Sequence, residues 1–263
     1  MTAELLLRAG AHPIIGHRGA SGLAPENTIA SFDLALEQGA EAFEFDLRMT
    51  RDGVPVVFHD PTLDRTTDGK GPLLDRALAD LPRFDAGARF SADGGRTFPF
   101  RGQGVRIPTL AEMLARYPQV PFLIELKEVG AAGPAAEEIA RAGAENRVVV
   151  ASFHDQAVAR FRRRPFHPGA SRREIVRLAA GALVGHAVDD PAELYAVPDR
   201  YRDLIPVPTR RFVAAATRFG KPVHVWTVND PERANRLWDV GCSGMITNFP
   251  GLLLAARRSR FGS

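Results

Sequence analysis

Ala42-Phe-Glu-Phe-Asp-Leu47 and Val54-Pro-Val-Val-Phe-His59 are two apolar runs of strand length in which acidic or imidazole side chains hold fixed places. Successive side chains of a strand point to opposite faces. Glu44 and Asp46 therefore share one face of the first run, and its aromatic residues share the other. The first run predicts a strand that carries two carboxylates on one wall of a pocket.

Similar runs recur along the chain with helical patterns between them, which indicates βα units. The predicted strands are 13–16, 42–47, 54–59, 121–125, 147–153, 181–186, 204–207, 222–228 and 244–248. The predicted helices are 26–38, 110–117, 135–144, 156–163, 210–219 and 231–240. If the second strand and its hairpin extension count as one unit, about eight βα repeats remain. We therefore expect an α/β protein with a closed parallel (β/α)8 TIM-type barrel rather than an open doubly wound sheet.

The rhythm of strands and helices breaks between residues 60 and 106, where Gly, Pro, Asp and Arg dominate. A segment of this length is either disordered or packed. Four phenylalanines give it apolar surface to bury: Phe84, Phe90, Phe98 and Phe100. We therefore expect a single domain, 1–263, with a small insertion after the second strand at about 60–106.

The composition limits the classes of function. The chain has 263 residues, 45% hydrophobic and 25% charged, which excludes a fibre and a disordered tail. The net charge is +3 with the basic residues spread out, so we expect no nucleic-acid partner. The apolar runs are far shorter than the roughly 20 residues that span a bilayer, so we expect no transmembrane segment. Cys242, the single cysteine, calls for no oxidising compartment, and the cytoplasm is the expected location.

A third acid, Glu125, lies near the end of the apolar run 122–126. The carboxyl ends of the strands in a parallel barrel form the active site, so Glu125 is expected near Glu44 and Asp46. Three converging carboxylates repel one another unless a cation lies among them, and oxygen ligands suit a hard divalent ion. The alternative is that each carboxylate pairs with an arginine.

His17 and His59 each end an apolar run, so two imidazoles also belong to strand ends. Histidine exchanges protons readily near neutral pH. Arg18 and Lys127 add positive charge that suits a phosphate. Hydrogen-bonded structural roles fit four other histidines better: His12, His154, His167 and His186. A cation, two histidines and two basic residues together indicate phosphoryl chemistry.

Ordered motifs along nearly the whole chain carry a family resemblance. They are Gly16-His-Arg-Gly-Ala20, Ala24-Pro-Glu-Asn-Thr28, Glu44-Phe-Asp46, Asp52-Gly53, Pro55-Val-Val-Phe-His-Asp60, Leu63-Asp-Arg-Thr-Thr-Asp-Gly69, Ile107-Pro-Thr-Leu110, Ile124-Glu-Leu-Lys127, Ser152-Phe153, Val225-Trp-Thr-Val-Asn229 and Gly244-Met-Ile-Thr-Asn248. Through these motifs and their order, the chain resembles the glycerophosphodiester phosphodiesterase family.

The resemblance implies metal-dependent hydrolysis of glycerophosphodiesters, such as glycerophosphocholine or glycerophosphoethanolamine, to glycerol 3-phosphate and an alcohol. It implies one divalent ion, Ca²⁺ or Mg²⁺ with Mn²⁺ as a further candidate. The residues that match family positions are the metal ligands Glu44, Asp46 and Glu125, the acid–base pair His17 and His59, the phosphate contacts Arg18 and Lys127, the barrel-mouth Trp226, and the bordering Glu26 and Asn27. A homo-oligomer is compatible with this interpretation.

Two features depart from the family pattern. Asn248 stands where the family usually has Asp, which puts a charge role there in doubt, and residues 165–201 match poorly. Two alternatives stay open for the function: a lysophospholipase D-like phosphodiesterase that uses the same site, and a non-catalytic barrel that binds phosphodiesters. The attacking group is also open between water and the substrate's own glycerol hydroxyl, and so is the division of acid and base between the histidines.

Overall fold

The computed structural model describes residues 2–202 and 204–262. Within them, eight parallel strands lie in the order β6-β5-β4-β2-β1-β11-β10-β7, and β3 pairs antiparallel with β2. A parallel bridge between Gly169 and Leu194 joins the two outer strands, β6 and β7, and closes the ring. The strands are β1 (Ile14–His17), β2 (Ala42–Met49), β3 (Pro55–Val57), β4 (Phe122–Leu126), β5 (Val148–Ala151), β6 (His167–Pro168), β7 (Tyr195–Pro198), β10 (Val223–Trp226) and β11 (Met245–Thr247).

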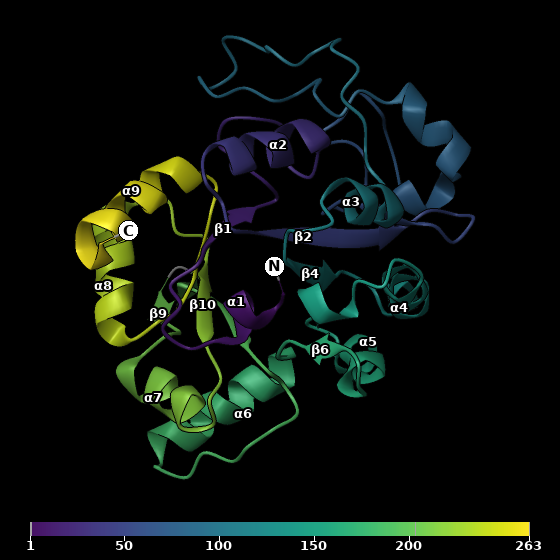
Figure 1. Ribbon diagram of the computed structural model, residues 1–263. Helices are drawn as coiled ribbons and strands as arrows, with labels where there is room; N and C mark the ends of the chain where they lie inside the picture. The colour runs from purple at the N-terminus through teal and green to yellow at the C-terminus, as the bar shows by residue number, and fades with distance from the viewer. Residues whose placement is uncertain (1, 203, 263) are drawn as a thin grey trace.

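The helices surround these strands in chain order, from α2 through α9, as Figure 1 shows. They are α2 (Ile29–Glu37), α3 (Leu110–Arg116), α4 (Ala132–Arg141), α5 (Asp155–Ala159), α6 (Arg172–Leu183), α7 (Arg210–Arg218), α8 (Pro231–Val240) and α9 (Pro250–Phe261). The short α1 (Glu4–Leu7) lies near the centre of the ring. The expected TIM-type β/α barrel is confirmed.

Alternation along the strands creates two apolar layers. Phe43 and Phe45 of β2 point outward and pack with Phe32 of α2, between the sheet and the helices. Side chains on the other face of the strands, such as Leu123, fill the barrel interior together with Leu6 of α1. Helix α1 therefore closes the end of the barrel opposite to the carboxyl ends of the strands.

Local signals explain where most helices begin. Asp230 caps α8 by accepting from the backbone N–H of Arg233, and Pro231 fills the first helical position. The prediction of 231–240 for this helix is confirmed. The helix predicted from residue 26 begins only at Ile29, because Asn27 has a φ of +58° and Thr28 is the capping residue.

Two of the strands predicted for the barrel, 181–186 and 204–207, are not barrel strands. Residues 181–186 include the end of α6, whose start is fixed by a capping box between Ser171 and Glu174. Residues 204–207 include β9 (Ile205–Pro206), which pairs with β8 (Arg200–Tyr201) in a hairpin outside the barrel. The barrel strands in this region are β6 and β7, and β6 has only two residues, one of them proline.

The segment that follows β3 contains two short 3₁₀ helices, Leu73–Asp75 and Leu78–Arg83. Its buried centre is aliphatic and includes Leu63, Leu73 and Leu81. The four phenylalanines of the segment are only half-buried. The N–H of Val57 donates to the carbonyl of Pro108, so the end of the segment lies against β3 just before α3.

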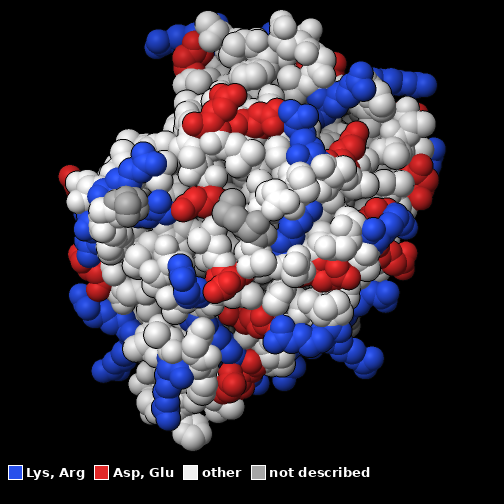
Figure 2. Space-filling model, in the orientation of Figure 1, with Lys and Arg blue, Asp and Glu red and all other residues white. Residues whose placement is uncertain are grey.

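The remaining features concern membrane-spanning helices and the distribution of charge on the surface. No helix in residues 2–202 and 204–262 combines the length and the apolar character needed to cross a membrane. Figure 2 shows acidic and basic side chains interspersed over the side of the molecule seen in Figure 1. The basic residues form no broad patch on this side.

Candidate active site

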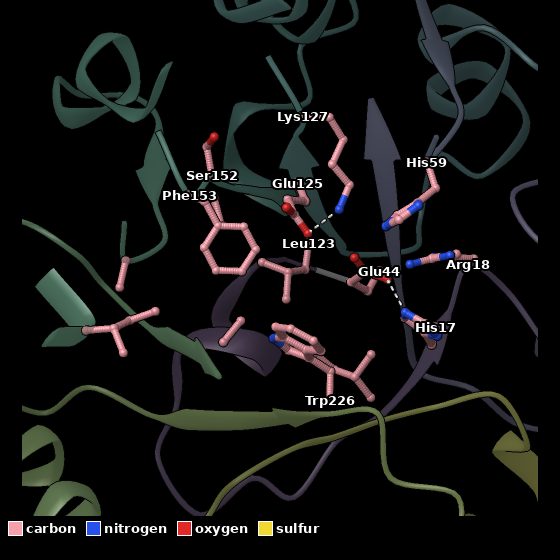
Figure 3. A pocket seen from close by; sticks show the side chains of 15 residues that line it. His17, Arg18, Glu44, His59, Leu123, Glu125, Lys127, Ser152, Phe153 and Trp226 are labelled. Carbon is pink, nitrogen blue, oxygen red and sulfur yellow. Dashed lines mark ion pairs between the residues drawn. The ribbon is translucent and has the colours of Figure 1, made fainter. Parts of the chain in front are cut away.

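The carboxyl ends of β1, β2 and β4 bring the predicted acids and one histidine together. The strand register pairs His17 of β1 with Glu44 of β2, and Asp46 of β2 with Glu125 of β4. The inward face of β2 carries both of its carboxylates, as the alternation predicts. Figure 3 shows the resulting pocket, with His17, Arg18 and His59 on one side and Phe153 and Trp226 on the other.

Glu44, Asp46 and Glu125 form a cluster that can hold a metal ion. Each offers one carboxylate oxygen, and these oxygens lie within 4.8 Å of one another. The Oε2 atom of Glu44 is buried and accepts no hydrogen bond from the described protein. Oxygen ligands of this kind suit a hard divalent cation, so the donor set fits the ion that the sequence analysis predicts.

Electrostatics show how negative this cluster is. Burial and the Asp46 carboxylate raise the pKa of Glu44 well above its usual value. Burial also raises the pKa of Glu125, against the opposing effect of Lys127. Burial disfavours the charge of Asp46 too, but Arg18 and Lys127 outweigh it and hold the pKa of this carboxyl below its usual range. A further positive charge would stabilise all three carboxylates in their ionised form.

Both predicted phosphate contacts are ion-paired to the cluster. The Lys127 Nζ lies 2.9 Å from Asp46 Oδ1 and 2.8 Å from Glu125 Oε2. The Arg18 Nε lies 2.9 Å from Asp46 Oδ2, and its Nη1 donates to Glu26 at 2.8 Å. The alternative in which each carboxylate pairs with an arginine is therefore met, in the described part of the chain, by Asp46 alone, because Glu125 pairs with Lys127. Among residues 2–202 and 204–262, Glu44 has no such partner within 4 Å other than His17, at 3.9 Å.

Asn27 and Arg18 share an unusual backbone conformation, with φ of +58° and +54°. The Asn27 N–H donates to the Arg18 carbonyl, and its Nδ2 donates to Asp46 Oδ2 at 3.0 Å. The Asn27 Oδ1 is buried and has no hydrogen-bond partner among the described residues. Asn27, predicted at the border of the site, is thus in direct contact with Asp46 of the cluster.

His17 is held by Asn248, whose Oδ1 lies 2.7 Å from Nδ1. The same amide oxygen also accepts from the Ser21 hydroxyl. Because this oxygen can only accept, His17 carries its proton on Nδ1 and presents Nε2 toward Glu44. Burial and the nearby Arg18 lower the pKa of His17 to about 4. Asn248 thus fills the position of the usual Asp as a neutral acceptor.

His59 is held by an ionic chain that the sequence analysis did not predict. Its Nδ1 lies 2.5 Å from Asp60 Oδ1, and Asp60 accepts from the Nε of Arg65 at 2.5 Å. Arg65 then donates to both oxygens of Glu26, which in turn pairs with Arg18. The only sequence signals for Asp60 and Arg65 are their places inside the quoted motifs. This chain links the two histidine-bearing loops on one side of the pocket.

The opposite wall of the pocket is apolar. The rings of Phe153 and Trp226 meet edge to face with their centroids 6.3 Å apart. Leu123 and Ile175 add further apolar surface to the pocket lining. Trp226 therefore lines the pocket, and Phe153, which the sequence motif included without a role, lies beside it.

The structure thus brings the predicted site residues together. Seven line the pocket directly: His17, Arg18, Glu44, His59, Glu125, Lys127 and Trp226. Asp46 lies beneath them and contacts Arg18, Lys127 and Asn27. Glu26 lies at the side, in contact with Arg18.

Comparison with known proteins identifies the family. The sequence profile described as the Glycerophosphoryl diester phosphodiesterase family matches residues 17–252. A glycerophosphodiester phosphodiesterase of Caldanaerobacter subterraneus subsp. tengcongensis is 33% identical over 254 residues, which cover 92% of this chain and 96% of that protein. A glycerophosphodiester phosphodiesterase of Bacillus subtilis is 31% identical over 257 residues, covering 90% of this chain and 84% of that protein.

Solved structures agree with this result. A phosphodiesterase of Oleispira antarctica, in complex with the product sn-glycerol-3-phosphate, superposes with a TM-score of 0.72 at 26% identity and covers 93% of this chain and 96% of that chain. A domain of a Mycobacterium tuberculosis protein shares the fold with a TM-score of 0.83 at 22% identity, covering 95% of this chain and 99% of that chain. The chain described here belongs to the glycerophosphoryl diester phosphodiesterase family of enzymes.

Proposed function

We propose that this enzyme hydrolyses glycerophosphodiesters, with glycerophosphocholine and glycerophosphoethanolamine as representative substrates, to glycerol 3-phosphate and an alcohol. The observation that carries the proposal is the convergence of three carboxylates between two histidines and two basic side chains in one pocket. The sn-glycerol-3-phosphate bound to the related Oleispira antarctica enzyme supports the same product.

The reaction is proposed to require one divalent cation, Ca²⁺ or Mg²⁺, with Mn²⁺ as a further candidate. Glu44, Asp46 and Glu125 would hold it, and beside them lies the buried amide oxygen of Asn27, which has no hydrogen-bond partner in the described part of the chain. Such an ion supplies positive charge that polarises the phosphoryl oxygens of the substrate. Arg18 and Lys127 lie beside the cluster and would bind the same phosphoryl group.

The geometry supports different roles for the two histidines, one as general base and the other as general acid. His17 has its proton on Nδ1, and burial lowers its pKa to about 4, so its Nε2 is unprotonated near neutral pH. We assign His17 as the general base that removes the proton from the attacking oxygen. His59, held by Asp60, then gives a proton to the departing alkoxide.

The attacking oxygen is proposed to be the glycerol hydroxyl next to the phosphate, which would form a cyclic phosphate that water then opens. An internal attack holds both reactants in place, and such proximity contributes roughly 7–11 kcal/mol in favourable cases. An analogue with this hydroxyl replaced by hydrogen should then be close to inert. Hydrolysis of the analogue within about tenfold of the parent rate, a barrier change of only ~1.4 kcal/mol, excludes the internal route.

The most direct test of the activity is a substrate panel. Glycerophosphocholine, glycerophosphoethanolamine, lysophosphatidylcholine and bis(p-nitrophenyl) phosphate are each incubated with the cation-loaded enzyme. We expect glycerol 3-phosphate from the first two substrates. Absence of glycerol 3-phosphate from both, with the protein folded and a cation present, contradicts the proposal.

We also propose the cytoplasm as the place of action, because the single cysteine, Cys242, is buried with its thiol free. All the proposed site residues come from one chain. Formation of a homo-oligomer would therefore be independent of the assembly of the site.

A further inference from the structure

Three turns on the apolar side of the pocket carry an unusual surface. They follow the carboxyl ends of β5, β6 and β7, so they face the same side of the barrel as the pocket. The first contains Phe153, which lines the pocket, and the second leads through Ala170 and Ile175, which line it too. The third is the β8–β9 hairpin, whose Asp199 donates its N–H to the Trp226 carbonyl. All three turns therefore border the entrance.

Six arginines lie in these turns, and we call them the arginine rim. They are Arg172 and Arg173 in the first turn of α6, Arg200 and Arg202 in the hairpin, and Arg210 and Arg211 in the first turn of α7. All six are exposed, and none makes an ion pair with a carboxylate of the described residues. The same turns also contain Asp155, which is exposed, and Asp203, which lies outside the described residues.

Stability of the fold does not explain the arginine rim. Four of its members occupy the first turn of a helix, where the helix dipole disfavours positive charge. The basic residues on the catalytic side differ, because Arg18, Arg65 and Lys127 all pair with carboxylates. The charge of the rim, which has no carboxylate partner among the described residues, is therefore available to a partner with negative charge.

Exposed apolar side chains lie in the same turns and in α6. In the hairpin, Tyr201, Leu204 and Ile205 are 42%, 77% and 61% exposed. Val176 of α6 is 59% exposed, and Phe153 is 44% exposed. Large aliphatic side chains at this exposure leave apolar surface in water, and such surface together with basic residues is typical of segments that enter a lipid interface.

We propose that the arginine rim and the apolar side chains of the β8–β9 hairpin dock this enzyme on anionic phospholipid membranes. Arginine guanidinium groups suit lipid phosphates, and Leu204 and Ile205 would enter the acyl boundary. The entrance of the pocket would then face the membrane. A protein partner on this surface would cover the entrance, and a nucleic acid would leave the aliphatic side chains without a role.

The docking rests on the proposed function and extends it to a further class of substrate. An enzyme bound to a membrane has its active site close to lysophospholipids. Such a lipid has the same phosphodiester, with an acyl chain on the glycerol that the apolar wall of Phe153 and Trp226 would contact. The bond between phosphorus and the head-group oxygen breaks, an oxygen from water is added to phosphorus, and the head-group alkoxide takes a proton. The products are an acylglycerol phosphate and the head-group alcohol.

Vesicle sedimentation with the full chain tests the docking. The vesicles contain phosphatidylcholine alone or phosphatidylcholine with phosphatidylglycerol. We expect binding only to the second kind, weakened by added salt, since each basic residue near an anionic surface strengthens binding about fivefold. The double variant Arg200→Glu/Arg202→Glu and the double variant Leu204→Ser/Ile205→Ser should each lose at least about tenfold in affinity.

A matched control reverses the same number of charges elsewhere. Arg8 follows α1 and Arg258 lies in the last turn of α9; both are exposed and neither is ion-paired within the described chain. The variant Arg8→Glu/Arg258→Glu should keep its membrane affinity within about twofold. Equal loss in this control, equal binding to both kinds of vesicle, or equally tight binding of duplex DNA at the same salt overturns the proposal.

Two activity assays separate this proposal from the proposed function. The hairpin variants should hydrolyse soluble glycerophosphocholine at the wild-type rate, which also shows that they are folded. Their hydrolysis of lysophosphatidylcholine in anionic vesicles should fall with their membrane affinity. An unchanged rate on the vesicles contradicts the docking, whereas a wild-type enzyme inactive on glycerophosphocholine contradicts the proposed function and leaves the sedimentation test valid.

Discussion

The two sides of the barrel entrance are built in different ways. On the side of β1, β2 and β4, charged groups are partly or fully buried and joined in a chain from His59 through Arg65 to Arg18. On the side of β5 to β7, the pocket wall is apolar and the rim arginines have no carboxylate partner in the described chain. Buried charges need fixed partners, whereas exposed ones do not. One side is thus organised for chemistry and the other for contact with a substrate or a surface.

The strongest test of this contrast is the loss of either proposed acid–base histidine. His17→Ala and His59→Ala should each lower kcat by about 10²–10⁴-fold, the usual effect of removing a general acid or base. Steady-state release of glycerol 3-phosphate measures the effect.

His154 supplies the control, because it lies next to Phe153 on the apolar side and is exposed. His154→Ala should keep kcat within about twofold of the wild-type value. If His154→Ala, in a folded protein, lowered kcat as much as His17→Ala, the acid–base chemistry would lie on the apolar side of the pocket, which contradicts the account.

A second prediction uses His224, a fully buried histidine of β10 that the sequence analysis did not single out. It bonds to the Leu6 carbonyl through Nε2 and accepts from the Gly244 N–H through Nδ1. Burial lowers its pKa to about 4, from 6.5 in the unfolded chain. The unfolded state therefore binds the proton first as the pH falls, so this contribution to stability is present above pH 6.5 and is lost between pH 6.5 and 4.

Because of His224, the free energy of unfolding should be about 3 kcal/mol lower at pH 4 than above pH 6.5. Urea unfolding of the wild type and of His224→Gln at several pH values measures it. The variant should be less stable near neutral pH and should lose less stability on acidification. Parallel acid profiles for the two proteins contradict the assignment of His224 as a neutral structural group.

Asp60 should act by positioning His59 rather than by contact with substrate. Asp60→Asn keeps the size of the side chain but weakens its hold on both His59 and Arg65, so kcat should fall by about 10–100-fold, as for the loss of an orienting partner. The basic limb of the pH–rate profile should move as well, because the charge beside the imidazole is removed. A lower kcat with an unmoved pH profile would indicate a structural role alone.

The smallest effect is expected on the apolar wall. Phe153→Ala removes one half of the aromatic pair with Trp226, whose interaction contributes roughly 0.5–1.5 kcal/mol. KM for lysophosphatidylcholine should rise severalfold, while kcat for glycerophosphocholine stays near the wild-type value. A drop in kcat on both substrates, with KM unchanged, would show that Phe153 takes part in the chemistry.

The same contrast explains how much the sequence could predict. On the catalytic side, β2 alternates clearly over eight residues and β4 carries its acid near its end, so both the strands and their inward carboxylates were predictable. On the other side, β6 has two residues and β7 has four, ending in proline. Strands this short leave no period to detect, and the apolar run in α6 was mistaken for one of them.

Site residues such as Glu44 and His59 were predictable, because a carboxylate or an imidazole at a strand end itself indicates a chemical role. Their partners were not, because a partner such as Arg65 or Asn248 is defined by distance in space. Asn248 lies 231 positions from His17 in the chain, and only closure of the barrel brings them together. His224 gave no signal either, since its role depends on burial against α1.

The measurement that tests the central claim most directly is the metal dependence of glycerophosphocholine hydrolysis. The enzyme is stripped with a chelator, shown to be metal-free by elemental analysis, and assayed before and after addition of Ca²⁺, Mg²⁺ or Mn²⁺. We predict that kcat falls on the order of 10³-fold in the metal-free protein and returns as about one ion binds per chain, and that Glu44→Gln weakens this recovery. Unchanged turnover by the verified metal-free protein would contradict the assignment of the three carboxylates as a catalytic metal site.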